Sequence, residues 1–106
     1  MTPKKIANQV VDWCCKYFDL DVKVKVKIGY RSSLDCWGIC YQGKKDHHYI
    51  IEVAQDQCVK DFVATVVHEM VHVKQWETDK WDGDGEDEAY HLQYSLANKM
   101  WKLGIL

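Results

Sequence analysis

The stretch Val66-Val67-His68-Glu69-Met70-Val71-His72 decides the fold of this chain, because it combines a core-facing pattern with metal-binding chemistry. It lies in a segment from about residue 58 to 76 whose apolar residues recur at three- and four-residue spacing and predict a helix. The apolar face of that helix consists of Phe62, Val63, Val66, Val67, Met70 and Val71. His68, Glu69 and His72 fall toward the opposite side. Since positions i and i+4 lie one turn apart, the two imidazoles can hold one ion with Glu69 beside them.

The segments around this helix predict the other elements of an α+β domain. Apolar residues at helical spacing predict a first helix over residues 4–18 and a last helix over residues 85–102. Strict alternation over residues 22–28 (VKVKVKI) predicts a strand with an aliphatic face and a solvated row of lysines. Further strands are expected over residues 34–41 and 47–54. We therefore expect one domain over the whole chain, in which a three-stranded antiparallel meander stands between the first helix and the last two.

Size and composition exclude several classes of protein. The chain has 106 residues, of which 47% are hydrophobic, and this suits a single modest core. A formal net charge of −2 gives no electrostatic case for nucleic-acid binding. No apolar run approaches the ~18 residues of a membrane span. The odd count of 5 cysteines, and a start that lacks the apolar stretch of a secretory signal, favour reduced thiols and a cytoplasmic location.

A third metal ligand is expected from the last helix. Catalytic zinc takes three protein ligands and leaves a fourth position for water. Glu88 is the preferred third ligand, because its neighbour Ala89 marks the inward face of that helix; His91 is the main competitor. Glu86 and Asp87 are expected to act as first-turn acids that the helix dipole favours.

Two stretches carry a resemblance to a known class of enzymes. Residues 66–76 (VVHEMVHVKQW) and residues 86–96 (EDEAYHLQYSL) resemble short zincin metallopeptidases of the gluzincin type. The layout is similar to SprT-like and ImmA/IrrE-like domains, above all the small versions encoded by bacteriophages, and the resemblance covers about residues 34 to 100. It implies a zincin-like minimal domain with one Zn²⁺ per chain, located in the host cell cytoplasm if phage-encoded. Such families place the third ligand at the position of Glu88, whereas Lys74 departs from their apolar pattern.

The resemblance implies a zinc-dependent metallopeptidase that hydrolyses peptide bonds by a zinc-activated water, with Glu69 as general base. A second group is expected to hold the oxyanion, with His91 preferred over the other candidates, which are Tyr90, Tyr94, His47 and His48. Backbone groups of residues 49–53 are expected to bind a peptide or protein substrate by strand addition. Tyr49, Ile51 and Tyr90 are accordingly the expected substrate-binding residues. Trp76 and Trp81 flank the loop before the last helix and are candidates to line the cleft.

Two other classes are compatible with parts of the pattern. The first is a catalytically silent zinc-binding module that captures a protein partner. The second is a di-iron protein, because Glu69-x-x-His72 and Glu88-x-x-His91 both have the Glu-x-x-His spacing; the strands expected over residues 22–54 disfavour the four-helix scaffold that such a centre needs. The pattern leaves the oligomeric state and the identity of the substrate open.

Overall fold

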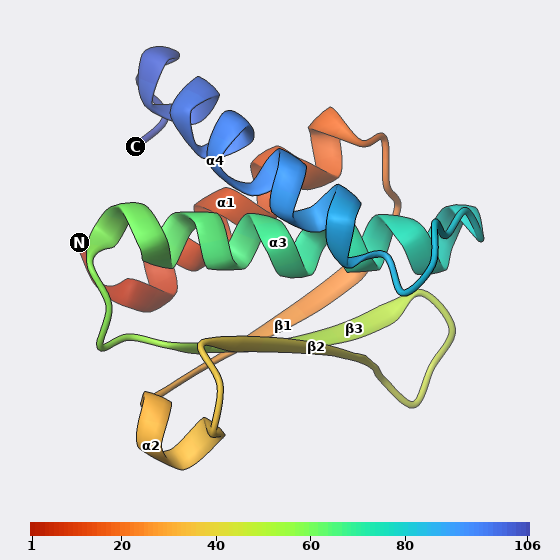
Figure 1. Cartoon of the computed structure of the whole chain (residues 1–106), viewed down its shortest axis with the longest axis horizontal. Coiled ribbons are helices and arrows are strands. Elements are labelled where there is room, and N and C mark those ends of the chain that lie inside the picture. Colours follow the sequence, from red (N-terminus) through yellow and green to blue (C-terminus); the bar gives the residue numbers. More distant parts are fainter.

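The computed structural model describes residues 1–106 and confirms the α+β class. Its elements follow the chain in the order shown in Figure 1: α1 (Pro3–Tyr17), β1 (Lys23–Gly29), α2 (Arg31–Leu34), β2 (Gly38–Gln42), β3 (His48–Ala54), α3 (Val59–Thr78) and α4 (Glu86–Lys102). The three long helices and the first and third strands lie within two residues of the expected bounds. The short helix α2 and the later start of β2 replace the beginning of the strand expected over residues 34–41.

The sheet is mixed, so the predicted antiparallel meander is wrong. Its strand order is β1-β3-β2; β1 pairs with β3 in parallel and β2 pairs with β3 antiparallel. A meander would place β1 beside β2. Instead, the segment that contains α2 carries the chain across to the far side of β3, as a parallel pair requires a crossover. The central strand is therefore β3, and β2 is an edge of the sheet.

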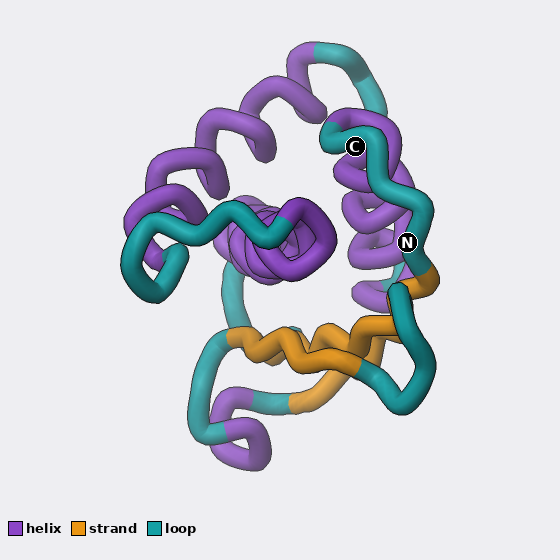
Figure 2. The backbone as a smooth tube through the Cα atoms, turned by 90° about the vertical axis from the view of Figure 1, so that its right-hand side faces the viewer, coloured by secondary structure: helices purple, strands orange, loops and turns teal.

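Helices α1 and α3 pack on one face of the sheet, and α4 packs on α3. Figures 1 and 2 show α1, α3 and α4 on one side of the strands, with α2 on the other. The predicted apolar face of α3 is buried in full, and it packs with the β3 residues Tyr49, Ile51 and Val53 in one hydrophobic cluster. The lysines of β1 are exposed, while Val26 on its other face is buried, which confirms the alternation expected there.

A tight loop returns the chain from α3 to α4. Asp79 at the end of α3 has φ 53°, and Gly83 and Gly85 have φ 62° and 79°, all in the left-handed region. At Gly85 a side chain would also overlap the buried amide of Gln75. Glycine at this position therefore lets the first turn of α4 lie directly against α3 beside His72.

Candidate metal centre

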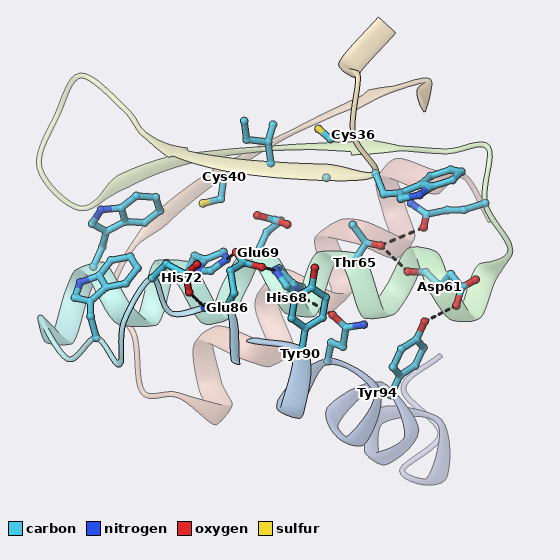
Figure 3. A pocket seen from close by; sticks show the side chains of 18 of the residues that line it. Cys36, Cys40, Asp61, Thr65, His68, Glu69, His72, Glu86, Tyr90 and Tyr94 are labelled. Atoms are coloured by element: carbon cyan, nitrogen blue, oxygen red, sulfur yellow. Dashed lines mark hydrogen bonds and ion pairs between the residues drawn. The ribbon is translucent and has the colours of Figure 1, made fainter. Parts of the chain in front are cut away.

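Three side chains from α3 and α4 converge on one point. His68 Nε2 lies 3.0 Å from Glu86 Oε2, and His72 Nε2 lies 2.8 Å from Glu86 Oε1. One ligand atom of each residue can be chosen such that all three lie within 4.8 Å of one another. Both histidines are 9% exposed. Figure 3 shows the two imidazoles and the Glu86 carboxylate gathered in this way. The predicted pair, His68 and His72, thus lies on one side of α3 as expected.

The other nitrogen of each histidine is held by a glutamine. His68 Nδ1 lies 2.7 Å from Gln93 Oε1, and His72 Nδ1 lies 2.7 Å from Gln75 Oε1. An amide oxygen only accepts, so each Nδ1 carries a hydrogen and donates it. In a neutral imidazole this leaves the Nε2 lone pair facing Glu86.

The donor set fits a metal ion. With neutral imidazoles, the two Nε2 lone pairs and the carboxylate are all acceptors at 2.8–3.0 Å, so this arrangement needs a cation between them or a proton on each Nε2. A hydrogen-bonded Nδ1 also fixes ring orientation, as it does for metal-ligating histidines in general. The group His68, His72 and Glu86 can therefore bind a metal ion.

Gln75 connects this centre to the start of α4. It is fully buried, and its Nε2 donates to Gly85 O at 2.9 Å and to Glu88 Oε1 at 3.0 Å. Since both donors and the oxygen have partners, the amide orientation is set by the network. One side chain thus orients His72 and anchors the turn that presents Glu86.

Glu69 lies beside the centre and faces the edge strand. It is 6% exposed, and burial raises the pKa of its carboxyl, while the nearby His68 and His72 act in the opposite direction. A side chain at Gly38, the first residue of β2, would approach Glu69 Oε2 to 3.4 Å, so the carboxylate lies close to the start of that strand. A carboxylate with a raised pKa accepts a proton more readily than an exposed glutamate does.

Glu88, the predicted third ligand, does not join the histidines; Glu86 takes that place in the group that can hold an ion. Glu88 Oε2 accepts a hydrogen bond from Lys74 Nζ at 2.7 Å, and Oε1 accepts from Gln75. These contacts, that of Lys74 first, hold the pKa of Glu88 below its usual value. Lys74, the departure from the zincin pattern, is therefore the residue that engages Glu88. Glu86 was expected to serve only the helix dipole.

His91 is not at the centre either. It lies exposed on α4 and does not line the cleft described below. Neither a ligand role nor an oxyanion role for His91 agrees with that position. The second Glu-x-x-His pair, Glu88 and His91, does not join the group of His68, His72 and Glu86, so the structure does not bring the two pairs together as a di-iron centre requires.

Tyr49 and Ile51 are core residues, so their predicted role in substrate binding is wrong. Ile51 is 0% exposed and Tyr49 is also buried. Because β3 is paired on both sides, residues 49–53 have no free backbone edge to offer an added strand. Tyr90 does lie at the centre: its ring contacts that of His68 edge-on, with centroids 4.8 Å apart.

An open cleft of about 860 Å³ contains the centre. Its floor is the polar face of α3, one wall is β2 with the residues before it, and the other wall is α4 with the preceding loop. Trp76 and Trp81 line it, as the sequence predicted. The free edge of the sheet thus lies over the metal centre.

Several residues of the site were missed from the sequence: Glu86, Gln75, Gln93 and Gly38. A signal for two of them exists, since Glu86, Tyr90, Gln93 and Tyr94 form a polar and aromatic stripe at i, i+4, i+7 and i+8 on α4. Gln75 and Gly38 carry no such signal, because their roles depend on which elements pack against them.

Comparisons with models of known protein families, with curated proteins and with solved structures find no match to this chain. None of its helices combines the length and apolar character that a bilayer crossing needs. The fold and the site therefore define an α+β domain with a His68–His72–Glu86 group that can bind a metal ion at the floor of a cleft.

Proposed function

We propose that this chain is a zinc-dependent metallopeptidase of the zincin type. The observation that carries the proposal is the convergence of His68, His72 and Glu86 beside the carboxylate of Glu69, inside an open cleft. Two imidazoles and one carboxylate form a ligand set that catalytic zinc uses. Structural zinc is normally closed by four protein ligands, often cysteines; here only three groups meet.

The roles of the chain's own residues follow from their positions. When bound, zinc supplies a Lewis acid and lowers the pKa of a bound water toward ~7. Glu69 accepts a proton from the attacking water and passes it to the leaving nitrogen. The hydroxyl of Tyr90 takes the place proposed earlier for His91 and donates to the developing oxyanion, since its ring adjoins His68.

Strand β2 presents the backbone groups that orient a substrate. Ala54 N donates to Trp37 O, and Gly43 N donates to His48 O. Because hydrogen-bonded pairs alternate in an antiparallel ladder, the N–H and C=O of Gly38, Cys40 and Gln42 are directed to the free edge. An extended peptide can pair with these groups by strand addition, so β2 replaces residues 49–53 in this role.

The substitution Glu69→Gln tests the proposal. Zinc binding is expected to persist, while hydrolysis of an unfolded protein substrate falls by roughly 10²- to 10⁴-fold. Asp87→Asn, an exposed neighbour on α4, is the matched control and is expected to retain activity. Undiminished turnover in Glu69→Gln contradicts the role of Glu69 as base.

The alternative function, a catalytically silent zinc-binding protein-interaction module, is favoured by one observation. The side chains of Trp37, Tyr90 and Tyr94 around the cleft are exposed, as aromatic residues of partner-binding surfaces often are. The same experiment separates the peptidase from the interaction module. If the chain is an interaction module, wild type and Glu69→Gln bind a partner equally well and neither cleaves it.

A further inference from the structure

The length of the cleft indicates how many residues of an extended peptide it can hold. Its lining runs along one face of α3, from Asp61 through Thr65 and His72 to Trp76. At a rise of about 1.5 Å per residue this distance is roughly 22 Å, the length of about six or seven extended residues. The metal centre lies between the two ends. A bound segment would therefore extend on both sides of the reacting bond.

The two ends of the cleft differ in chemistry. At the C-terminal end of α3 the rings of Trp76 and Trp81 meet edge-to-face, with centroids 5.6 Å apart, and Trp81 also stacks on His72 at 6.3 Å. These rings form an aromatic wall beside the metal centre. At the other end the aromatic residues Trp37 and Tyr94 are accompanied by hydrogen-bonded polar groups: Asp61 Oδ1 accepts from the Tyr94 hydroxyl at 2.7 Å, and Thr65 donates to Gln57.

The charges around the cleft limit which side chains a bound segment can carry. The acidic residues that line the cleft are Asp61, Glu69, Asp84 and Glu86, and the lining contains no lysine or arginine. At the polar end Lys60 lies 5.8 Å from the centre of the Tyr94 ring, beside Asp61, so charges of both signs are present there. At the aromatic end the lining contains Asp84. An acidic side chain would meet repulsion at that end.

The direction of β2 assigns the ends to the two sides of the substrate. Figure 3 shows Cys36, just before β2, near the Thr65 and Asp61 end and Cys40 above His72, so β2 runs toward the aromatic wall. Antiparallel pairing is slightly more stable per residue than parallel pairing, and a segment paired in this way runs opposite to β2. Its residues before the reacting bond would lie at Trp76 and Trp81, and those after it at Asp61.

From these observations we infer that the Trp76–Trp81 wall is a subsite for a large apolar or aromatic side chain on the N-terminal side of the cleaved bond, in an extended, non-acidic segment of about six residues. This inference rests on the proposed function and names its substrate class. Cleavage is internal to the segment, since the centre lies between the ends of the cleft.

Binding to the base-disabled protein tests the subsite apart from catalysis. Blocked heptapeptides of alanine and threonine with Phe, Ala or Glu at one central position are titrated into zinc-loaded Glu69→Gln. The Phe peptide is expected to bind most tightly and the Glu peptide most weakly. Adding Trp81→Ala is expected to weaken binding of the Phe peptide by roughly three- to tenfold. Trp101→Ala, an exposed tryptophan outside the cleft, is the matched control and leaves binding unchanged.

Equal binding of the three peptides, or an equal effect of the two tryptophan substitutions, overturns the subsite. In a second arm, zinc-loaded wild type is incubated with the Phe peptide and the cut is located by mass spectrometry. Cleavage on the C-terminal side of Phe supports the assigned direction, and cleavage on its N-terminal side overturns it. Selective binding without any cleavage by wild type rejects the proposed peptidase activity and leaves the apolar subsite in place.

Discussion

At the scale of single residues, the orientation of His68 and His72 depends on the side-chain amides of two glutamines. Gln75 and Gln93 accept from the Nδ1–H of His72 and His68 and so keep both Nε2 atoms available to a cation. Charge is thereby concentrated in Glu86 and Glu69, the two carboxylates that face the cleft beside the histidines.

Gln75→Met is expected to weaken zinc binding by roughly 10- to 100-fold, because His72 loses its acceptor and Gly85 loses its anchor. Chelator competition measures the dissociation constant, and circular dichroism checks that the variant is folded. Gln57→Met is the control, since Gln57 lines the same cleft but bonds Ala54 and Thr65 instead. An unchanged zinc affinity in Gln75→Met would show that the amide does not position His72.

The placement of His68, Glu69 and His72 on one side of α3 was predictable from the sequence, because i, i+4 spacing on a helix is a local property. The third member of the His68–His72–Glu86 group was not. Whether Glu86 or Glu88 reaches the histidines depends on the left-handed turn at Gly83 and Gly85 and on the engagement of Glu88 by Lys74. Both are tertiary effects that a spacing rule does not contain.

At the scale of elements, the position of β2 over α3 creates the cleft. A side chain at Gly38 would lie 2.5 Å from the methyl carbon of Thr65, so only glycine lets the edge strand approach this closely. The three long helices and the strands β1 and β3 were predicted well, since their periods are local. The pairing of β1 with β3 was not, because local alternation does not encode which strands become neighbours.

Gly38→Ala is expected to destabilise the fold by about 1–3 kcal/mol through overpacking against Thr65. Thr65→Ser removes the obstructing methyl and keeps the hydroxyl that bonds Gln57. The cost of Gly38→Ala in urea unfolding should therefore shrink in the Thr65→Ser background. The same cost in both backgrounds would place the strain elsewhere.

The turn between β2 and β3 is fastened to the end of α3 by an ion pair. His47 Nδ1 lies 2.8 Å from Glu77 Oε1, and this contact raises the pKa of His47 above its usual 6.5. Because the folded state binds this proton more tightly than the unfolded state, the contact stabilises the fold fully at pH values below 6.5. The stabilisation is lost as the pH rises through the higher pKa that His47 has in the folded state. His47→Ala should therefore lower the melting temperature more at about pH 6 than at about pH 9.

The control for this pair is His48→Ala, because the His48 side chain makes no ion pair. Its effect on the melting temperature should vary less with pH. A His47→Ala difference that is equal at both pH values would contradict a charged contact with Glu77.

At the scale of the whole molecule, the core and the metal centre are separate. The hydrophobic cluster joins α1, β1, β3, α3 and α4 and contains neither His68 nor His72. The fold should therefore persist without the ion, in contrast to zinc fingers, which unfold without metal. A single domain can be expected from the size and composition of the chain alone. The arrangement of the elements around a cleft cannot, because it depends on the non-local order of the strands.

Zinc is expected to raise the melting temperature without being required for folding. At a hundredfold excess over its dissociation constant a ligand stabilises the native state by about 2.7 kcal/mol, a shift on the order of 10 °C for a domain of this size. Differential scanning fluorimetry with zinc and with chelator measures it, and His72→Ala should show no such shift. A protein that unfolds at 25 °C on chelation would contradict the separation of core and centre.

The central claim is that His68, His72 and Glu86 hold one divalent ion. Zinc titration of wild type, Glu86→Ala and Glu88→Ala by calorimetry tests it most directly. The account predicts one site per chain in wild type, an affinity lowered by roughly 100-fold or more in Glu86→Ala, and a much smaller change in Glu88→Ala. No zinc binding by wild type, or a greater loss in Glu88→Ala than in Glu86→Ala, would contradict it.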